Sequence, residues 1–112
     1  MSKEYRKNKR VKPNVKIEIF DVIIGNGLGE VLNISSDGLL VACNKPIEIG
    51  EMFQTDWEFS ARGIKSISVG LECLWSEVQY TNFCLCGFHI IDISDGDQKI
   101  LDRIIAQSKE ID

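Results

Sequence analysis

The chain has 112 residues, of which 44% are hydrophobic, so it suits one domain with a sizeable core and excludes general disorder. No apolar run approaches the roughly 18–20 residues that span a bilayer, and the charged start does not resemble a signal peptide. We therefore expect a cytoplasmic protein without a membrane segment.

The formal net charge of -4 is divided unevenly, because residues 1–16 carry seven cations and one acid, whereas the remainder carries six cations and sixteen acids. A basic arm on an acidic body favours a small phosphorylated ligand, bound through the arm, over DNA or RNA.

Residues 1–14 are polar and are predicted to form an extended, flexible basic arm, followed by a single domain over 15–112. Apolar and charged residues alternate over 15–19, which is the period of a half-buried strand. The apolar residues 22–24 could extend this strand toward a turn at 25–27, where the sequence is Gly-Asn-Gly.

A second apolar run, residues 29–35, leads into Ser-Ser-Asp-Gly at positions 35–38. This composition is typical of a tight turn in which Gly38 is free to take a positive φ. Residues 39–43 resume as a strand, so the sequence predicts a hairpin here.

Further strands are predicted over 52–59, over 67–75 and over 83–91. The alternation over 67–75 is the clearest in the chain, and it places Trp75 on the same face as Ile67. We therefore expect Trp75, like Trp57 and most of the phenylalanines, to pack in the core.

The end of the chain predicts a helix over about 96–107. Ser94 followed by Asp97 resembles a capping box in which Asp replaces the usual Glu. A single apolar stripe follows, made of Ile100, Leu101, Ile104 and Ile105. About six short strands followed by one helix predict a mainly β fold, a small six-stranded antiparallel β-barrel with a C-terminal helix packed on it or on a partner.

The four cysteines, Cys43, Cys73, Cys84 and Cys86, are predicted to be reduced, buried, small hydrophobic residues. Cys84 and Cys86 share one strand face, and the single histidine, His89, lies on the other. Zinc sites usually combine C-x₂₋₄-C pairs with further Cys or His ligands. We expect no metal site and a structural role for His89.

No common catalytic motif is present: the chain lacks G-x-S-x-G, H-E-x-x-H and a Walker A loop. The carboxylates form no recognisable pair. We therefore predict no catalytic residues, no cofactor and no enzymatic activity.

Two short motifs stand out. Arg6 and Arg10 form R-x-x-x-R before the first predicted strand, and Asn33, Ser35 and Gly38 form N-x-S-x-x-G where a strand enters a turn. Each is common on its own, the first in solvated basic arms and the second in hairpin turns whose side chains bond to nearby backbone groups.

In this order, the two motifs resemble those of the PilZ domain family, which carries R-x-x-x-R in an N-terminal arm and [D/N]-x-S-x-x-G on a β-barrel. The similarity continues through 47–51, 71–75 and 87–88, although the phenylalanine of the last segment comes one place early, and through the terminal helix. The resemblance implies a non-enzymatic receptor for the bacterial second messenger cyclic di-GMP. It implies that the ligand is bound by Arg6, Arg10, Asn33, Ser35 and Gly38, with Tyr5 as a candidate for a further contact.

The chemistry of arginine agrees with this implication. Its planar fork binds phosphate oxygens bidentately and also pairs with guanine O6 and N7, which Lys7 and Lys9 cannot reproduce. We expect the ligand to order the basic arm and so to create a surface for an unidentified protein effector.

Two alternatives remain open. One is a PilZ-like module that binds a protein partner and no nucleotide. The other is a binder of single-stranded nucleic acid that uses the basic arm, against which the expected burial of the tryptophans argues. The apolar stripe of the helix could also support self-association, although packing on the barrel is its simpler role.

Overall fold

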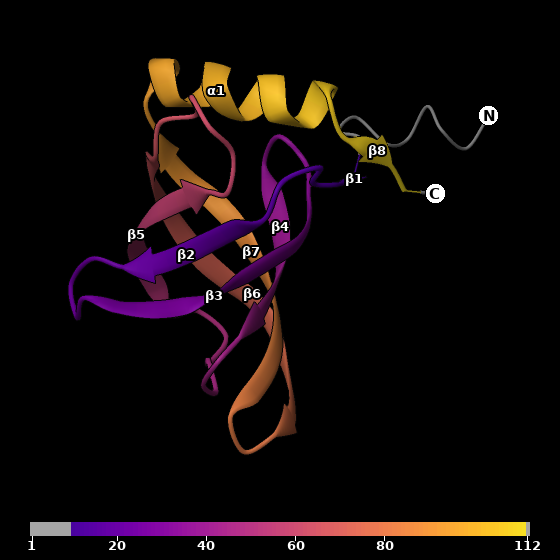
Figure 1. Cartoon of the computed structure of the whole chain (residues 1–112). Helices are drawn as coiled ribbons and strands as arrows, with labels where there is room; N and C mark the ends of the chain where they lie inside the picture. The colour runs from indigo at the N-terminus through magenta and orange to yellow at the C-terminus, as the bar shows by residue number, and fades with distance from the viewer. Residues whose placement is uncertain (1–9, 112) are drawn as a thin grey trace.

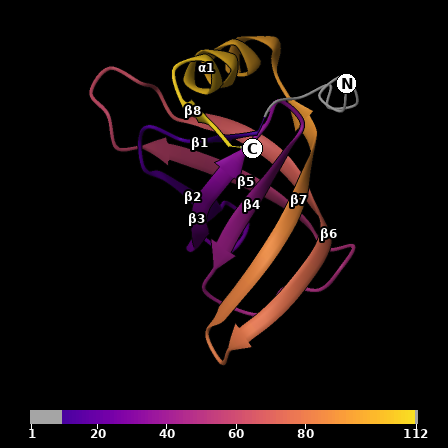
Figure 2. The ribbon, with the colours of Figure 1, turned by 90° about the vertical axis from the view of Figure 1, so that its right-hand side faces the viewer.

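The computed structural model describes residues 10–111, and these form a closed barrel of six antiparallel strands with a helix across one end (Figures 1 and 2). The barrel strands are β2 (Ile17–Asp21), β3 (Asn26–Ile34), β4 (Gly38–Cys43), β5 (Met52–Phe59), β6 (Ile67–Tyr80) and β7 (Phe83–Ile93). They neighbour one another in the order β2-β5-β6-β7-β4-β3, and pairing of β2 with β3 closes the ring. The predicted mainly β fold and six-stranded barrel are confirmed.

Two short strands lie outside the barrel and were not predicted. Strand β1 (Val11–Lys12) pairs with β3 through Val11 and Ile34, and with β8 (Lys109–Glu110) through both of its residues. Each has only two residues, too few to show a hydrophobic period. Through β1 and β8, the last part of the predicted basic arm lies beside the end of the chain.

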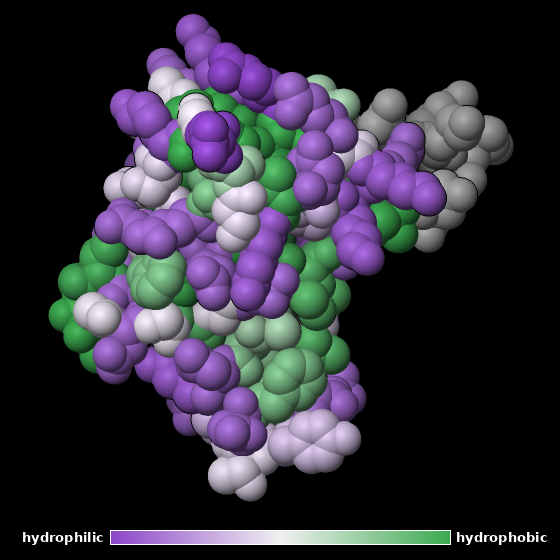
Figure 3. Space-filling model, in the orientation of Figure 1, coloured by the Kyte–Doolittle hydropathy of each residue, from purple (hydrophilic) through white to green (hydrophobic). Residues whose placement is uncertain are grey.

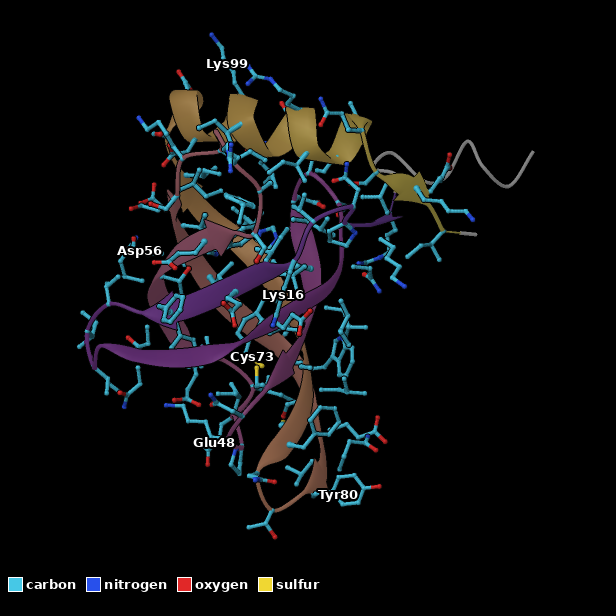
Figure 4. All side chains as sticks on the ribbon, viewed as in Figure 1. Lys16, Glu48, Asp56, Cys73, Tyr80 and Lys99 are labelled. Carbon is cyan, nitrogen blue, oxygen red and sulfur yellow. The ribbon has the colours of Figure 1, made fainter. Side chains whose placement is uncertain are left out.

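The core follows from the alternation along the barrel strands, whose inward side chains are buried. Trp57 is fully buried, as the sequence predicted. All four cysteines are free and buried, which confirms their predicted role, and Figure 4 shows Cys73 among the barrel strands.

The first hairpin differs from the prediction. Residues 22–24 do not extend β2; they form the turn between β2 and β3 together with Gly25, which takes a φ of 84°. Buried Asp21 organises the turn, because its Oδ1 accepts hydrogen bonds from the backbone N–H groups of Ile23 at 2.9 Å and Ile24 at 3.4 Å. Asn26 and Gly27, predicted to be in the turn, instead begin β3.

The prediction that Trp75 packs in the core is wrong. The pairing register between β6 and β7 shifts between Cys73 and Trp75, so Leu74 is an extra residue in β6. The bulge reverses the alternation, and the Trp75 side chain is 45% exposed on the outer surface.

Helix α1 (Asp95–Ala106) begins where the capping pattern indicated. The hydroxyl of Ser94 accepts a hydrogen bond from the Asp97 backbone N–H at 3.1 Å. The Asp97 carboxylate accepts one from the Ser68 backbone N–H at 3.0 Å, so it joins the helix to the start of β6. Leu101 and Ile104 of the predicted stripe are buried on the barrel.

Within residues 10–111, no helix is long and apolar enough to cross a membrane.

Candidate functional site

Residues of the two sequence motifs meet at the outer edge of β3. The pairing of β1 with β3 carries Arg10, which precedes β1, to the side of Asn33. The Arg10 Nη1 atom donates a hydrogen bond of 2.7 Å to Asn33 Oδ1, across 23 positions of sequence. Both side chains are accessible to solvent, and the N–H groups of the Asn33 amide remain able to donate.

Ser35 begins the turn between β3 and β4 and is only 4% exposed. Its backbone N–H donates to the Gly38 carbonyl at 2.8 Å, and its hydroxyl lies 3.1 Å from Asp37 Oδ1 and 3.3 Å from the Gly38 carbonyl. The Asp37 carbonyl accepts from the Ile90 backbone N–H at 2.8 Å, which fixes the turn to β7. Ser35 therefore holds the shape of the turn in this structure.

Gly38 does not have the positive φ that the sequence suggested, because it already belongs to β4. It is needed for a different reason. A Cβ atom at this position would lie 3.1 Å from the Phe88 carbonyl oxygen, which is tighter than ordinary van der Waals contact. The glycine thus allows close approach of β4 and β7 beside the turn, a role that the sequence analysis did not anticipate.

A row of outward-facing residues extends from this point across four strands. Asn33 pairs with Leu40, Leu40 with Gly87, and Gly87 with Trp75. The indole of Trp75 occupies the space that a Cβ atom on Gly87 would take. The sequence did not predict this row, because the bulge at Leu74 puts Trp75 on the outer face and the alternation of residues 67–75 gives no sign of a bulge.

A hollow of about 290 Å³ lies between residues 12–16 and residues 30–32, the segment of β3 that precedes Asn33. Two cations, Lys12 and Lys16, line it together with Glu30 and with apolar side chains. Lys16 also forms an exposed ion pair of 3.8 Å with Glu18. The site thus combines a planar cation, an amide, a fixed turn and an apolar outer row.

The remaining predicted residues, Tyr5 and Arg6, lie outside the described residues. Arg10, Asn33, Ser35 and Gly38 all lie around the β3–β4 turn, although only Arg10 and Asn33 touch through their side chains.

The barrel interior holds four buried, free thiols. The Cys84 and Cys86 sulfur atoms lie 3.5 Å apart. Burial raises the pKa of Cys73 to about 11, and a hydrogen bond with Cys43 followed by burial raises the pKa of Cys86 as well. Among residues 10–111, no group of three or more Cys, His, Asp or Glu side chains is placed to hold a metal ion.

In a comparison with protein families, the model of the PilZ domain matches residues 4–107. A search of curated proteins found no match.

Solved structures share the fold at low sequence identity. The inhibitor of motility MotI/DgrA of Bacillus subtilis superimposes with a TM-score of 0.67 at 16% identity, covering 91% of this chain and 50% of that one. The PilZ domain of YcgR from Escherichia coli, solved with cyclic di-GMP, gives 0.66 at 14% identity, covering 90% and 89%. Longer YcgR in complex with cyclic di-GMP gives 0.67 at 15% identity, covering 90% and 44%. This chain therefore spans about half the length of MotI/DgrA and of the longer YcgR chain.

Proposed function

Because this chain belongs to the PilZ domain family, we propose that it is a non-enzymatic receptor for cyclic di-GMP. The observation that carries the proposal is the 2.7 Å hydrogen bond between Arg10 and Asn33, since it joins the two motifs at one place on the barrel. The cyclic di-GMP in the two YcgR structures, which have the same fold, supports the choice of this ligand.

Arg10 is proposed to bind a phosphate or a guanine edge of the ligand. Its guanidinium is already held at the barrel surface by Asn33, so less side-chain entropy is lost on binding than from a free arm. Asn33 would donate its amide N–H groups to the ligand, and Arg6 would supply a second planar cation four residues before Arg10. Tyr5 remains a predicted further contact.

The turn is proposed to act through its shape. Ser35 would position the backbone from within, and Gly38 would leave room for the ligand beside β7. Leu40 and Trp75, which lie in the outer row that starts at Asn33, offer apolar surface against which a guanine base can pack.

The signal is proposed to pass from the basic arm to a protein effector. Ligand held between Arg6, Arg10 and the barrel would fix the arm, and the new surface would be read by a partner. Hydrogen exchange of the arm amides with and without ligand tests this relay, and equal protection at saturating ligand would refute it.

Calorimetric titration of the full chain with cyclic di-GMP tests the proposed function, with cyclic di-AMP and GMP as controls. Each charge-assisted hydrogen bond is worth about 1.5–3 kcal/mol, so Arg10→Ala should weaken binding at least about tenfold. Arg10→Lys keeps the charge but loses the fork, and it should weaken binding as well.

Lys99→Gln is the matched control, since Lys99 lies on α1 and Figure 4 shows it pointing away from the barrel. If Lys99→Gln and Arg10→Ala lost affinity for cyclic di-GMP equally, the loss would come from the change in net charge and not from the Arg10 side chain. Absence of binding by the unmodified chain at high micromolar ligand would sink the proposal.

The second candidate is a PilZ-like module that binds a protein and no nucleotide. The turn between β2 and β3 favours it, because Val22, Ile23 and Ile24 are exposed there, and Figure 3 shows apolar surface at this end of the hairpin. Failure of nucleotide binding would put this candidate first.

A further inference from the structure

A hollow of about 370 Å³ lies between the connection from β5 to β6, residues 60–66, and helix α1. Figure 2 shows this connection beside the helix, on the end of the barrel that α1 covers. Ile64, Ile100 and Ile104 give the hollow an apolar lining, and Figure 3 shows apolar surface beneath α1 with hydrophilic side chains around it.

Three cations, Arg62, Lys65 and Arg103, line the same hollow, and no acidic residue does. This is unexpected on an acidic body, because residues 10–111 contain nine Lys and Arg against fifteen Asp and Glu. Within that range, the structure gives none of the three an ion pair or a side-chain hydrogen bond. A third of the cations in the described chain thus gather around one hollow without partners.

Helix energetics account for one of the three cations only. Arg103 lies in the last turn of α1, where a positive charge complements the helix dipole. Arg62 and Lys65 come from a loop that has no such need, and their approach to Arg103 adds repulsion. An anion in the hollow would offset that repulsion.

We propose that this hollow binds a small amphipathic anion, an apolar group of a few carbon atoms that carries a phosphate or a carboxylate. The apolar group would pack on the isoleucines, and the three cations would bind the anionic end. The volume lies near the lower bound of the range of about 300–1,000 Å³ that is usual for small-molecule sites. None of the lining residues belongs to the candidate cyclic di-GMP site, so the proposal does not depend on that function.

Nuclear magnetic resonance titration of the full chain with phenyl phosphate at low salt tests the proposal. Inorganic phosphate supplies the anion alone and benzyl alcohol the apolar group alone. Phenyl phosphate should shift the backbone amide signals of Ile64, Lys65 and Gln107 and should bind at least fivefold more tightly than either control. Equal affinity for phenyl phosphate and inorganic phosphate would overturn the proposal, because it would reduce the effect to general charge attraction.

Two substitutions on the same helix separate the site from net charge. Arg103→Gln removes a lining cation, whereas Lys99→Gln removes an exposed cation that does not line the hollow. The first should weaken phenyl phosphate binding at least fivefold and the second less than twofold, and Lys65→Gln should behave like the first. Similar losses in Arg103→Gln and Lys99→Gln would overturn the proposal.

Two further experiments identify the source of the anion and test whether this hollow is separate from the proposed cyclic di-GMP site. Vesicles of phosphatidylcholine with phosphatidic acid test a lipid headgroup; sedimentation that depends on Arg103 assigns the site to lipid, and its absence alongside phenyl phosphate binding assigns it to a free molecule. Cyclic di-GMP at saturation should leave phenyl phosphate bound. Displacement would overturn the assignment of a second site without touching the proposed receptor function.

Discussion

Strand β3 connects two tight turns that are built alike but expose opposite kinds of surface. The turn before it, residues 22–25, is organised by the buried carboxylate of Asp21, and the turn after it, residues 35–38, by the buried hydroxyl of Ser35. The first presents apolar side chains to solvent, whereas the second lies beside Arg10 and Asn33.

The comparison shows that a buried polar residue fixes a turn and leaves its exposed positions free for recognition. Ile23 is 81% exposed, yet its backbone N–H is bonded to Asp21, so its exposure does not reflect a loose loop. The two turns should therefore differ in what they bind more than in how far they stabilise the fold.

The largest expected effect is that of Gly38→Val in the second turn. The new side chain would press on the Phe88 carbonyl oxygen, 3.1 Å from a Cβ, and would crowd the proposed ligand surface. We expect the free energy of unfolding to fall by about 1–3 kcal/mol and the affinity for cyclic di-GMP to fall at least about tenfold. Urea unfolding and calorimetry measure the two effects.

Gly25→Ala is the matched change in the first turn. Gly25 has a φ of 84° with open space around it, so alanine adds backbone strain of about 1–2 kcal/mol without a collision. Its affinity for cyclic di-GMP should equal that of the unmodified chain. A loss of affinity as large as that of Gly38→Val would contradict the assignment of the ligand to the second turn.

Asp21→Ala should lower the free energy of unfolding by about 1–2 kcal/mol, because the N–H groups of Ile23 and Ile24 lose their acceptor at a partly buried place. Asp21→Asn keeps an acceptor oxygen and should cost less. Thermal unfolding of the three chains measures the difference, and equal stability of the alanine and asparagine variants would show that the oxygen does not hold the turn.

Ser35→Ala should cost about 0.5–1.5 kcal/mol, since one neutral hydroxyl with partners inside its own turn is lost. If Ser35 acts through the turn, Ser35→Thr should preserve cyclic di-GMP binding better than alanine does. Wild-type affinity in the alanine variant would remove Ser35 from the predicted site.

The smallest effect is expected for Ile23→Ser, within about 0.5 kcal/mol in urea unfolding, because the side chain is already in solvent. A loss of more than about 1.5 kcal/mol would show that the Ile23 side chain packs against the fold, as it would if residues 22–24 extended β2.

The barrel was predictable because burial follows a period of two over most of its length, as in β5 from Met52 to Phe59. The errors occur where one side chain overrides that period. Asp21 ends β2, although the apolar residues that follow it predict a longer strand. The extra residue Leu74 turns Trp75 outward. Neither effect is local in sequence, since the turn depends on burial of a carboxylate and the bulge on pairing with β7.

Part of the candidate site was also predictable. The two motifs indicated Arg10 and Asn33 separately, but their contact requires strand β1, whose two residues carry no period. Leu40 and Trp75 escaped notice because their place in the row is set by register across four strands. Arg6 and Tyr5 remain predictions, outside the described residues.

The pairing of β1 with β8 has a consequence for connectivity. The backbone N–H of Ile111 donates to the Arg10 carbonyl at 2.9 Å, so the path of the chain through the fold begins and ends at one point (Figure 1). Closely spaced ends favour circular permutation and insertion of a domain into a longer polypeptide. A domain fused by a short linker before Arg10 or after Ile111 would therefore lie close to the proposed cyclic di-GMP site at Asn33.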